Sequence, residues 1–109
     1  MSTFDPMAAA IDWLDAYREE DLDLIIAMYA DDATVHCNCV GSTIVSGASK
    51  LRHYWMVRLR DHPASELLDL NPMENGARIS FATRLGAMSS LLSFDSSGRI
   101  VEQNFEPSK

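Results

Sequence analysis

Basic residues are scarce in this sequence. It has nine Lys and Arg against sixteen Asp and Glu, which gives a formal net charge of −7. A nucleic-acid-binding protein needs clustered Lys and Arg to displace counterions from phosphates. The cationic cluster that stands out comprises Lys50, Arg52, Arg58 and Arg60. It recurs along one predicted helix, a pattern typical of a solvated helix face, so we expect no nucleic-acid partner.

Long hydrophobic runs are also missing. No stretch approaches the ~20 apolar residues of a membrane-spanning helix. Residues 1–15 contain neither the basic segment nor the apolar run of a secretory signal peptide. We therefore expect no membrane partner and, by default, a cytoplasmic location, where cysteines are normally thiols. The length of 109 residues fits one compact domain over residues 1–109.

Cysteine is rare, and the two cysteines, Cys37 and Cys39, flank a single residue. In a strand they would share one face, while His36 would lie on the other. Their Cβ atoms would be roughly 7 Å apart, against roughly 4 Å in a disulfide, so no intrachain disulfide is expected. The pair supplies two of the three or four ligands that a metal needs, so we expect no metal and no cofactor.

The chemistry of Cys37 itself has two interpretations. The favoured one is a buried thiol that packs as a small hydrophobic side chain. The alternative is a nucleophile, which needs a neighbouring base or cation to lower the thiol pKa. His53 or Arg84 could supply that neighbour only through tertiary placement.

Apolar residues at helical spacing predict three helices. The first spans residues 5–19, where Asp5 can cap the start. The second spans residues 22–30 and begins after a similar capping residue, Asp21. The third spans residues 48–60. The stripe on one side of this third helix comprises Leu51, Tyr54, Trp55, Arg58 and Leu59.

Alternating and β-branched runs predict six strands. They cover residues 33–39, 43–46, 65–71, 78–85, 87–94 and 99–106. Asp-Ser-Ser-Gly at residues 95–98 predicts a hairpin turn between the last two. Because four strands follow one another without a helix, we expect a mostly antiparallel sheet. The order predicts an α+β domain with helices packed on one face of a curved sheet.

Four segments in this order resemble the NTF2-like superfamily, in particular its SnoaL-like and ketosteroid isomerase-like branch. They are DLDLIIAMYADDATV at 21–35, SG at 46–47, YW at 54–55 and FDSSGRI at 94–100. The resemblance covers about residues 8–106. It implies a cone-shaped fold in which a curved, mostly antiparallel sheet wraps around the three helices. It also implies a deep, mostly apolar pocket and a homodimer formed through the outer face of the sheet.

The resemblance also identifies positions that carry catalysis in ketosteroid isomerases. The aspartate base corresponds to Cys37, the oxyanion tyrosine to Trp13, and the protonated oxyanion aspartate to Ser90. An indole N–H cannot titrate, a thiol is a poor base here, and a serine is a weaker donor than a buried carboxylic acid. We therefore do not expect isomerase chemistry by the mechanism of that family.

These features favour the binding of a small apolar molecule, such as a ring, polyketide-like or steroid-like compound. The expected pocket lining comprises Trp13, Tyr17, Cys37, Tyr54, Met88, Ser90 and Asn104. One alternative is an isomerase, dehydratase or cyclase-type enzyme, which requires a titratable group inside the cone. Another is a dimeric association module, in which the late strands form a polar interface through Arg78, Arg84, Glu102 and Asn104.

Overall fold

The computed structural model describes residues 4–37, 43–84 and 86–107. The elements in chain order are α1 (Pro6–Arg18), α2 (Leu22–Ala27), β1 (Tyr29–Cys37), β2 (Thr43–Ser46), α3 (Ala48–Asp61), β3 (Ala64–Met73), β4 (Gly76–Thr83), β5 (Gly86–Phe94) and β6 (Ile100–Pro107). The strands form one sheet in the order β2-β1-β6-β5-β4-β3. Its pairings are antiparallel except β1 with β6, which is parallel. The predicted α+β class and mostly antiparallel sheet are confirmed.

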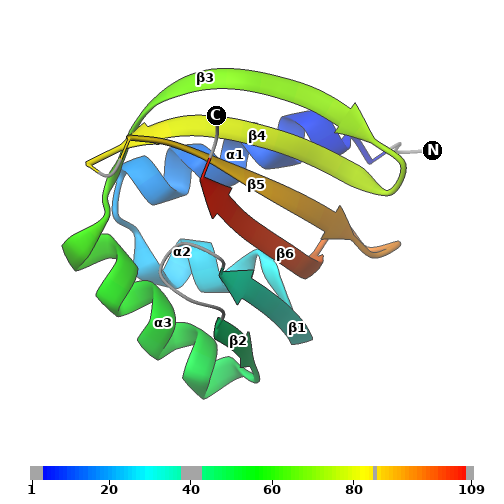
Figure 1. The fold of residues 1–109 in the computed structure, drawn as a ribbon. Helices are drawn as coiled ribbons and strands as arrows, with labels where there is room; N and C mark the ends of the chain where they lie inside the picture. The colour runs from blue at the N-terminus through cyan, green and yellow to red at the C-terminus, as the bar shows by residue number, and fades with distance from the viewer. Residues whose placement is uncertain (1–3, 38–42, 85, 108–109) are drawn as a thin grey trace.

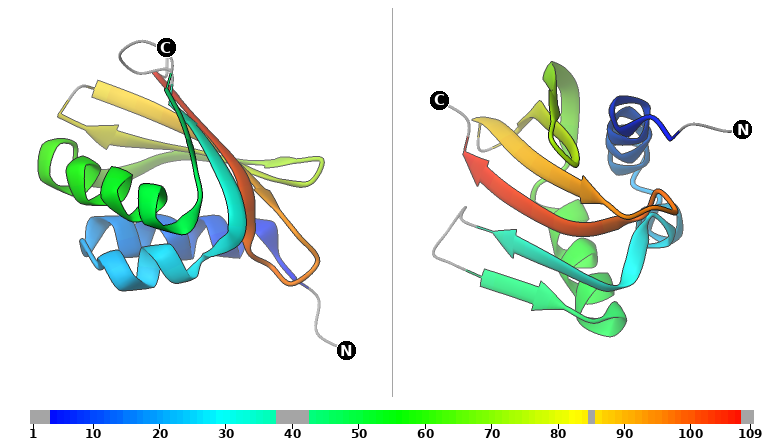
Figure 2. Two further views of the ribbon diagram at one scale, coloured as in Figure 1. Left: turned by 90° about the horizontal axis from the view of Figure 1, so that it is seen from below. Right: turned by 90° about the vertical axis from the view of Figure 1, so that its right-hand side faces the viewer.

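The sheet is strongly curved, and the three helices lie on its concave side (Figures 1 and 2). Helix α1 packs against β3 and β4, while α3 packs against β1 and β2. The apolar core fills the space between these helices and the inner face of the sheet. Within the described ranges, no helix has the length and apolar character needed to cross a membrane.

The start of each of the first two helices follows from a capping aspartate. The Asp5 carboxylate accepts a hydrogen bond from the Met7 amide at 3.0 Å. The Asp21 carboxylate accepts one from the Leu24 amide at 3.2 Å. Both predicted caps are confirmed, and they satisfy amide groups that have no partner within the helix.

The predicted end of the second helix at residue 30 is wrong. Helix α2 ends at Ala27, and β1 already begins at Tyr29. The physical reason is pairing with the last strand: the Ile100 amide donates to the Met28 carbonyl at 2.9 Å, and Tyr29 lies opposite Ile100. This pairing directs the Tyr29 side chain into the core, where it is 4% exposed.

The strand register assigns side chains to the two faces of the sheet. One inward row, running from β4 to β1, comprises Ile79, Ser90, Phe105 and Cys37. The neighbouring outward row comprises Arg78, Leu91, Asn104 and His36. Cys39 and Leu85, which the sequence placed at strand ends, lie outside the described residues.

Candidate functional site

Aromatic side chains fill the interior of the cone. Trp13 and Tyr17 come from α1, Trp55 from α3, and Phe81 and Phe105 from the sheet, and none has exposed surface. Their rings pack at an angle to one another, with centroids 4.9 Å apart for Tyr17 and Trp55 and 5.9 Å apart for Trp13 and Trp55. Aromatic pairs prefer such edge-to-face contacts to a face-to-face stack. The rings are therefore in mutual contact across the interior of the cone.

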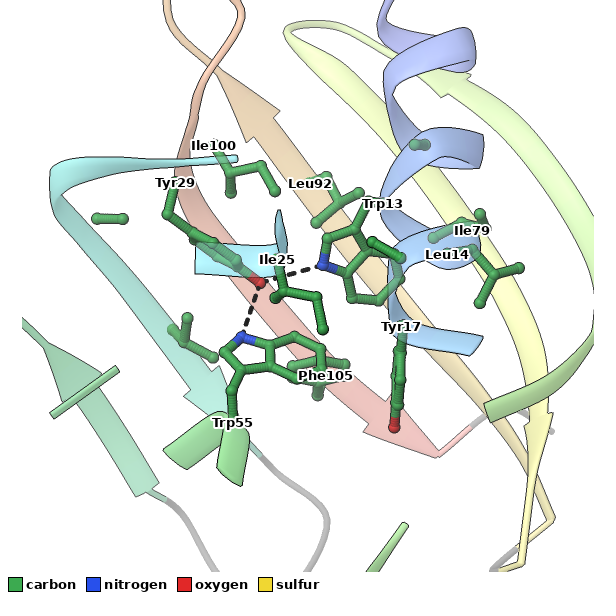
Figure 3. Close-up of a cluster of buried hydrophobic side chains, with 14 of the residues drawn as sticks. Trp13, Leu14, Tyr17, Ile25, Tyr29, Trp55, Ile79, Leu92, Ile100 and Phe105 are labelled. Carbon is green, nitrogen blue, oxygen red and sulfur yellow. Dashed lines mark hydrogen bonds between the residues drawn. The ribbon is translucent and has the colours of Figure 1, made fainter. Parts of the chain in front are cut away.

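A buried hydrogen-bond network runs through this aromatic core. The Tyr29 hydroxyl accepts from the indole nitrogens of Trp13 and Trp55, both at 3.2 Å (Figure 3). The same hydroxyl donates to the Gln103 side-chain carbonyl. The Gln103 amide in turn donates to the Ser90 hydroxyl at 2.7 Å. One hydroxyl thus satisfies three polar groups that are cut off from water.

The protonation state of Tyr29 fits this role. Burial raises the pKa of its hydroxyl well above the ordinary value, and the two indole N–H donors offset only part of the rise. A phenol with a raised pKa stays neutral at physiological pH and keeps its proton for Gln103. Tyr29 is therefore a structural hub and does not supply a base.

A second polar cluster surrounds Arg58 near the C-terminal end of α3. The Arg58 Nε donates to the Tyr17 hydroxyl at 2.9 Å, and an Nη donates to the Tyr54 hydroxyl at 3.3 Å. The guanidinium carbon lies 3.9 Å from the centre of the Phe105 ring. The Tyr17 hydroxyl donates onward to the His62 carbonyl at 2.5 Å. A permanently charged group thus sits against aromatic faces, an arrangement that the planar guanidinium tolerates well.

The interpretation of Arg58 as part of a solvated helix face is wrong. Arg58 is 5% exposed, whereas Arg52 and Arg60 on the same helix are exposed. The signal was present in the sequence, because Arg58 follows Leu51 and Trp55 at helical spacing on the buried stripe. At this position the helical spacing therefore predicts burial correctly, whereas the charged residue type suggests exposure.

The sequence pattern did not identify two further residues that form hydrogen bonds in the interior. Tyr29 was assigned to the end of a helix, so its inward direction from a strand was not foreseen. Gln103 alternates with Phe105 along β6 and is fully buried. That alternation could have identified it, since a polar residue in phase with an apolar strand face indicates a buried hydrogen bond.

The seven predicted pocket residues occupy different environments. Trp13, Tyr17 and Ser90 have no exposed surface, and Met88 is 3% exposed. Cys37 is half-buried opposite Phe105 in the β1–β6 pair. These side chains share the concave side, but in this conformation a ligand reaches the fully buried ones only if neighbouring rings move. Their contact with a ligand stays a prediction.

The remaining two predicted residues lie nearer to solvent. Tyr54 is half-buried and joins the Arg58 cluster on one side. Asn104 is opposite Leu91 on the outer face, where both line a hollow with Glu102. The structure therefore does not bring Asn104 together with the other six.

An open groove lies between the edge strand β2 and helix α3. Its volume is about 440 Å³, within the roughly 300–1,000 Å³ typical of small-molecule sites. Tyr54 is the predicted pocket residue that lines it. The groove, called the α3–β2 groove below, is lined by Ile44, Val45, Ser49, Lys50, His53, Tyr54 and Val57.

Another hollow is larger but chemically less suited to an apolar ligand. It has a volume of about 730 Å³ and lies between the C-terminal half of α1 and the start of β3. Its lining is mostly charged or polar and comprises Asp15, Arg18, Glu19, Ala64, Ser65 and Glu66. Among the residues that the structure describes, no three His, Cys, Asp or Glu side chains gather as metal ligands would.

Known proteins resemble this chain in structure. No protein-family model and no curated protein sequence matches it significantly. A SnoaL-like protein of unknown function from Burkholderia thailandensis superposes with a TM-score of 0.84 at 20% identity, covering 95% of each chain. SalBIII, an epoxide hydrolase/cyclase-like enzyme in pyran ring formation in the polyether salinomycin, gives a TM-score of 0.77 at 16% identity. That match covers 90% of this chain and 86% of SalBIII.

A protein from Kribbella flavida gives a TM-score of 0.75 at 18% identity, covering 92% of this chain and 84% of the other. Sequence identities this low establish a shared architecture and leave the activity open. The predicted resemblance is thus confirmed at the level of the fold. The protein has the NTF2-like fold of SnoaL-like proteins.

Proposed function

We propose that this protein binds a small, largely apolar molecule in the α3–β2 groove. The observation that carries the proposal is the position of Tyr54, whose side chain lines the groove and also reaches the Arg58 cluster. A ligand in the groove would rest on Val45, Tyr54 and Val57, and burial of apolar surface would supply most of its binding energy.

The buried chemistry favours binding over acid–base catalysis. In the described part of the chain, the buried polar or charged side chains are Arg58, Ser80, Ser89, Ser90 and Gln103. None of these buried groups is a carboxylate or an imidazole, the groups that usually move protons near neutral pH. The imidazoles lie nearer the surface: His53 lines the groove, and the half-buried His62 has a buried Nδ1 that has no hydrogen-bond partner among the described residues. SalBIII is described as a cyclase-like enzyme, but the likeness to it extends to the fold and does not supply a base here.

The groove assignment is tested by filling it. In the Val57→Trp variant the tryptophan side chain should fill the groove. The control, Met56→Trp, places the same side chain on the exposed side of α3, where Met56 is 55% exposed. We expect ring compounds that raise the melting temperature of the wild type to lose their effect in Val57→Trp alone. A ligand at a hundredfold excess over its dissociation constant stabilises the folded state by about 2.7 kcal/mol.

A third variant separates the groove from the cone interior. Cys37→Trp adds bulk from the inner face of β1 beside Phe105, and Cys37 is not among the residues that line the groove. Loss of the thermal shift in Cys37→Trp, with a full shift in Val57→Trp, would overturn the groove assignment and place the ligand in the cone.

A further inference from the structure

The exposed cationic side chains of α3 divide into those that have carboxylate partners and one, Lys50, that faces the groove. The Arg52 guanidinium lies 2.6 Å from an Asp23 oxygen, and Arg60 lies 2.9 Å from an Asp61 oxygen. Lys50 and His53 line the α3–β2 groove instead. In the described ranges neither makes an ion pair. The groove therefore holds one cationic side chain, Lys50, that no described carboxylate neutralises, with the imidazole of His53 beside it.

The lining of the groove has a polar end and an apolar end. Lys50 and Tyr54 are four residues apart, as are His53 and Val57, so the four side chains share one side of α3. Along that side, the polar Lys50 and His53 come first and the apolar Val57 comes last. Val45 from β2 is buried, and it extends the apolar surface. None of the lining residues is acidic, although the whole chain carries a formal net charge of −7.

From this arrangement we infer that the ligand of the α3–β2 groove is an amphipathic monocarboxylate: an apolar ring or short chain bearing one carboxylate. The carboxylate lies between Lys50 and His53, and the apolar part lies on Val45, Tyr54 and Val57. One lysine and one histidine match a single negative charge better than a phosphate dianion, which proteins usually bind with more donors. This inference rests on the proposed function, because it names the class of molecule that the groove takes.

The test compares two probes of equal shape and different charge. Naphthoate carries the carboxylate, and naphthamide replaces it with a neutral amide. By calorimetry, we expect the wild type to bind naphthoate about fivefold more tightly, the size of a solvent-exposed ion pair. Added salt should weaken naphthoate binding and leave naphthamide binding unchanged, since salt screens only the charged pair.

Matched variants assign the preference to its residues. Lys50→Gln should reduce the preference for naphthoate to near onefold while leaving naphthamide affinity intact. Arg52→Gln removes a neighbouring cation that already pairs with Asp23, so the preference should persist. If the preference for naphthoate disappears equally in both variants, the combined positive charge of the helix attracts the carboxylate. That result would overturn the specific role of Lys50.

The outcomes separate this inference from the proposed function. If naphthoate and naphthamide bind equally and Val57→Trp abolishes both, the groove binds small molecules but does not select an anion, and the inference is overturned alone. If naphthoate binds Val57→Trp as well as the wild type, the groove is not its site, and the inference and the proposed function both fail. If neither probe binds the wild type, the inference is overturned, while thermal shifts by neutral ring compounds still decide the proposed function.

Discussion

At the scale of single residues, the Tyr29 hydroxyl has three buried partners at once. Tyr29→Phe keeps the ring and removes the oxygen, so both indole N–H groups and the Gln103 carbonyl lose their partner. Each unsatisfied buried group costs about 1–3 kcal/mol. We therefore predict a loss of about 3–5 kcal/mol in the free energy of unfolding, measured by urea denaturation, which is a large fraction of the stability of a small domain.

Tyr54→Phe is the matched control for this prediction. The Tyr54 hydroxyl is half-buried, and its partner Arg58 keeps other contacts, including the one to Tyr17. We expect a loss of about 1 kcal/mol or less, because groups near solvent can bond to water. Equal losses in the two variants would contradict the role of Tyr29 as a hub.

The raised pKa of Tyr29 gives a separate prediction at alkaline pH. In the unfolded chain a tyrosine ionises near its ordinary pKa of about 10. In the folded state burial keeps Tyr29 protonated above that pH. The unfolded state therefore releases a proton that the folded state retains, and stability falls as pH rises above about 10, by up to 1.4 kcal/mol per pH unit for one group.

The comparison of wild type and Tyr29→Phe isolates this contribution. Urea titrations at successive pH values should show a shallower alkaline decline for Tyr29→Phe, because the variant lacks this phenol. Below about pH 9 the difference in stability between the two proteins should be constant. Parallel alkaline declines would mean that Tyr29 titrates normally in the folded state.

At the scale of elements, two glycines at strand ends are required for different physical reasons. A Cβ added to Gly76, at the start of β4, would lie 1.7 Å from the Leu92 carbonyl oxygen. Gly86, at the start of β5, has open space around such a Cβ but a φ of +105°. The first position thus depends on close contact between strand backbones, and the second on backbone conformation.

Alanine at each position should separate these two effects. We predict a loss of about 3 kcal/mol or more for Gly76→Ala, because β4 must move away from β5. For Gly86→Ala we predict about 1–2 kcal/mol, the cost of a left-handed conformation for an L-residue. Thermal or urea unfolding of both variants gives the order, and a larger loss in Gly86→Ala would contradict it.

The elements also show which features a sequence can predict. Helix caps at Asp5 and Asp21 and the alternation in the late strands depend on neighbours in the chain, and both were predicted correctly. The end of α2 depends on Ile100, which is more than seventy residues away. The α3–β2 groove likewise depends on how an edge strand meets a helix, so His53 and Lys50 carried no local sign of a site.

The candidate pocket shows the same division. The family resemblance placed Trp13 and Ser90 on the concave side, and the structure agrees. It could not show that the rings of Trp55 and Phe105 fill the space between them. Whether a cone is open depends on the summed volume of side chains from helices and strands that are far apart in the sequence, and no single motif encodes that volume.

At the scale of the whole molecule, we predict a homodimer formed through the outer face of the sheet. Leu91 lies centrally on that face, between Arg78 on β4 and Asn104 on β6. Leu91→Glu should place a charge in the interface and yield a monomer by light scattering at micromolar concentration. Leu24→Glu adds the same charge on α2, where Leu24 is 44% exposed, and should leave the dimer intact. A wild-type monomer would contradict the prediction outright.

The net charge of the chain makes this prediction sharper. Each protomer carries a formal charge of −7, so association brings two strongly acidic molecules together against their mutual repulsion. Raising the salt concentration from about 0.1 M to about 1 M shortens the Debye length from about 10 Å to about 3 Å. The dimer should therefore tighten as salt rises, whereas an interface held by Arg–carboxylate pairs across the sheet should weaken. Sedimentation equilibrium at the two salt concentrations distinguishes an interface based on Leu91 from one based on ion pairs of Arg78.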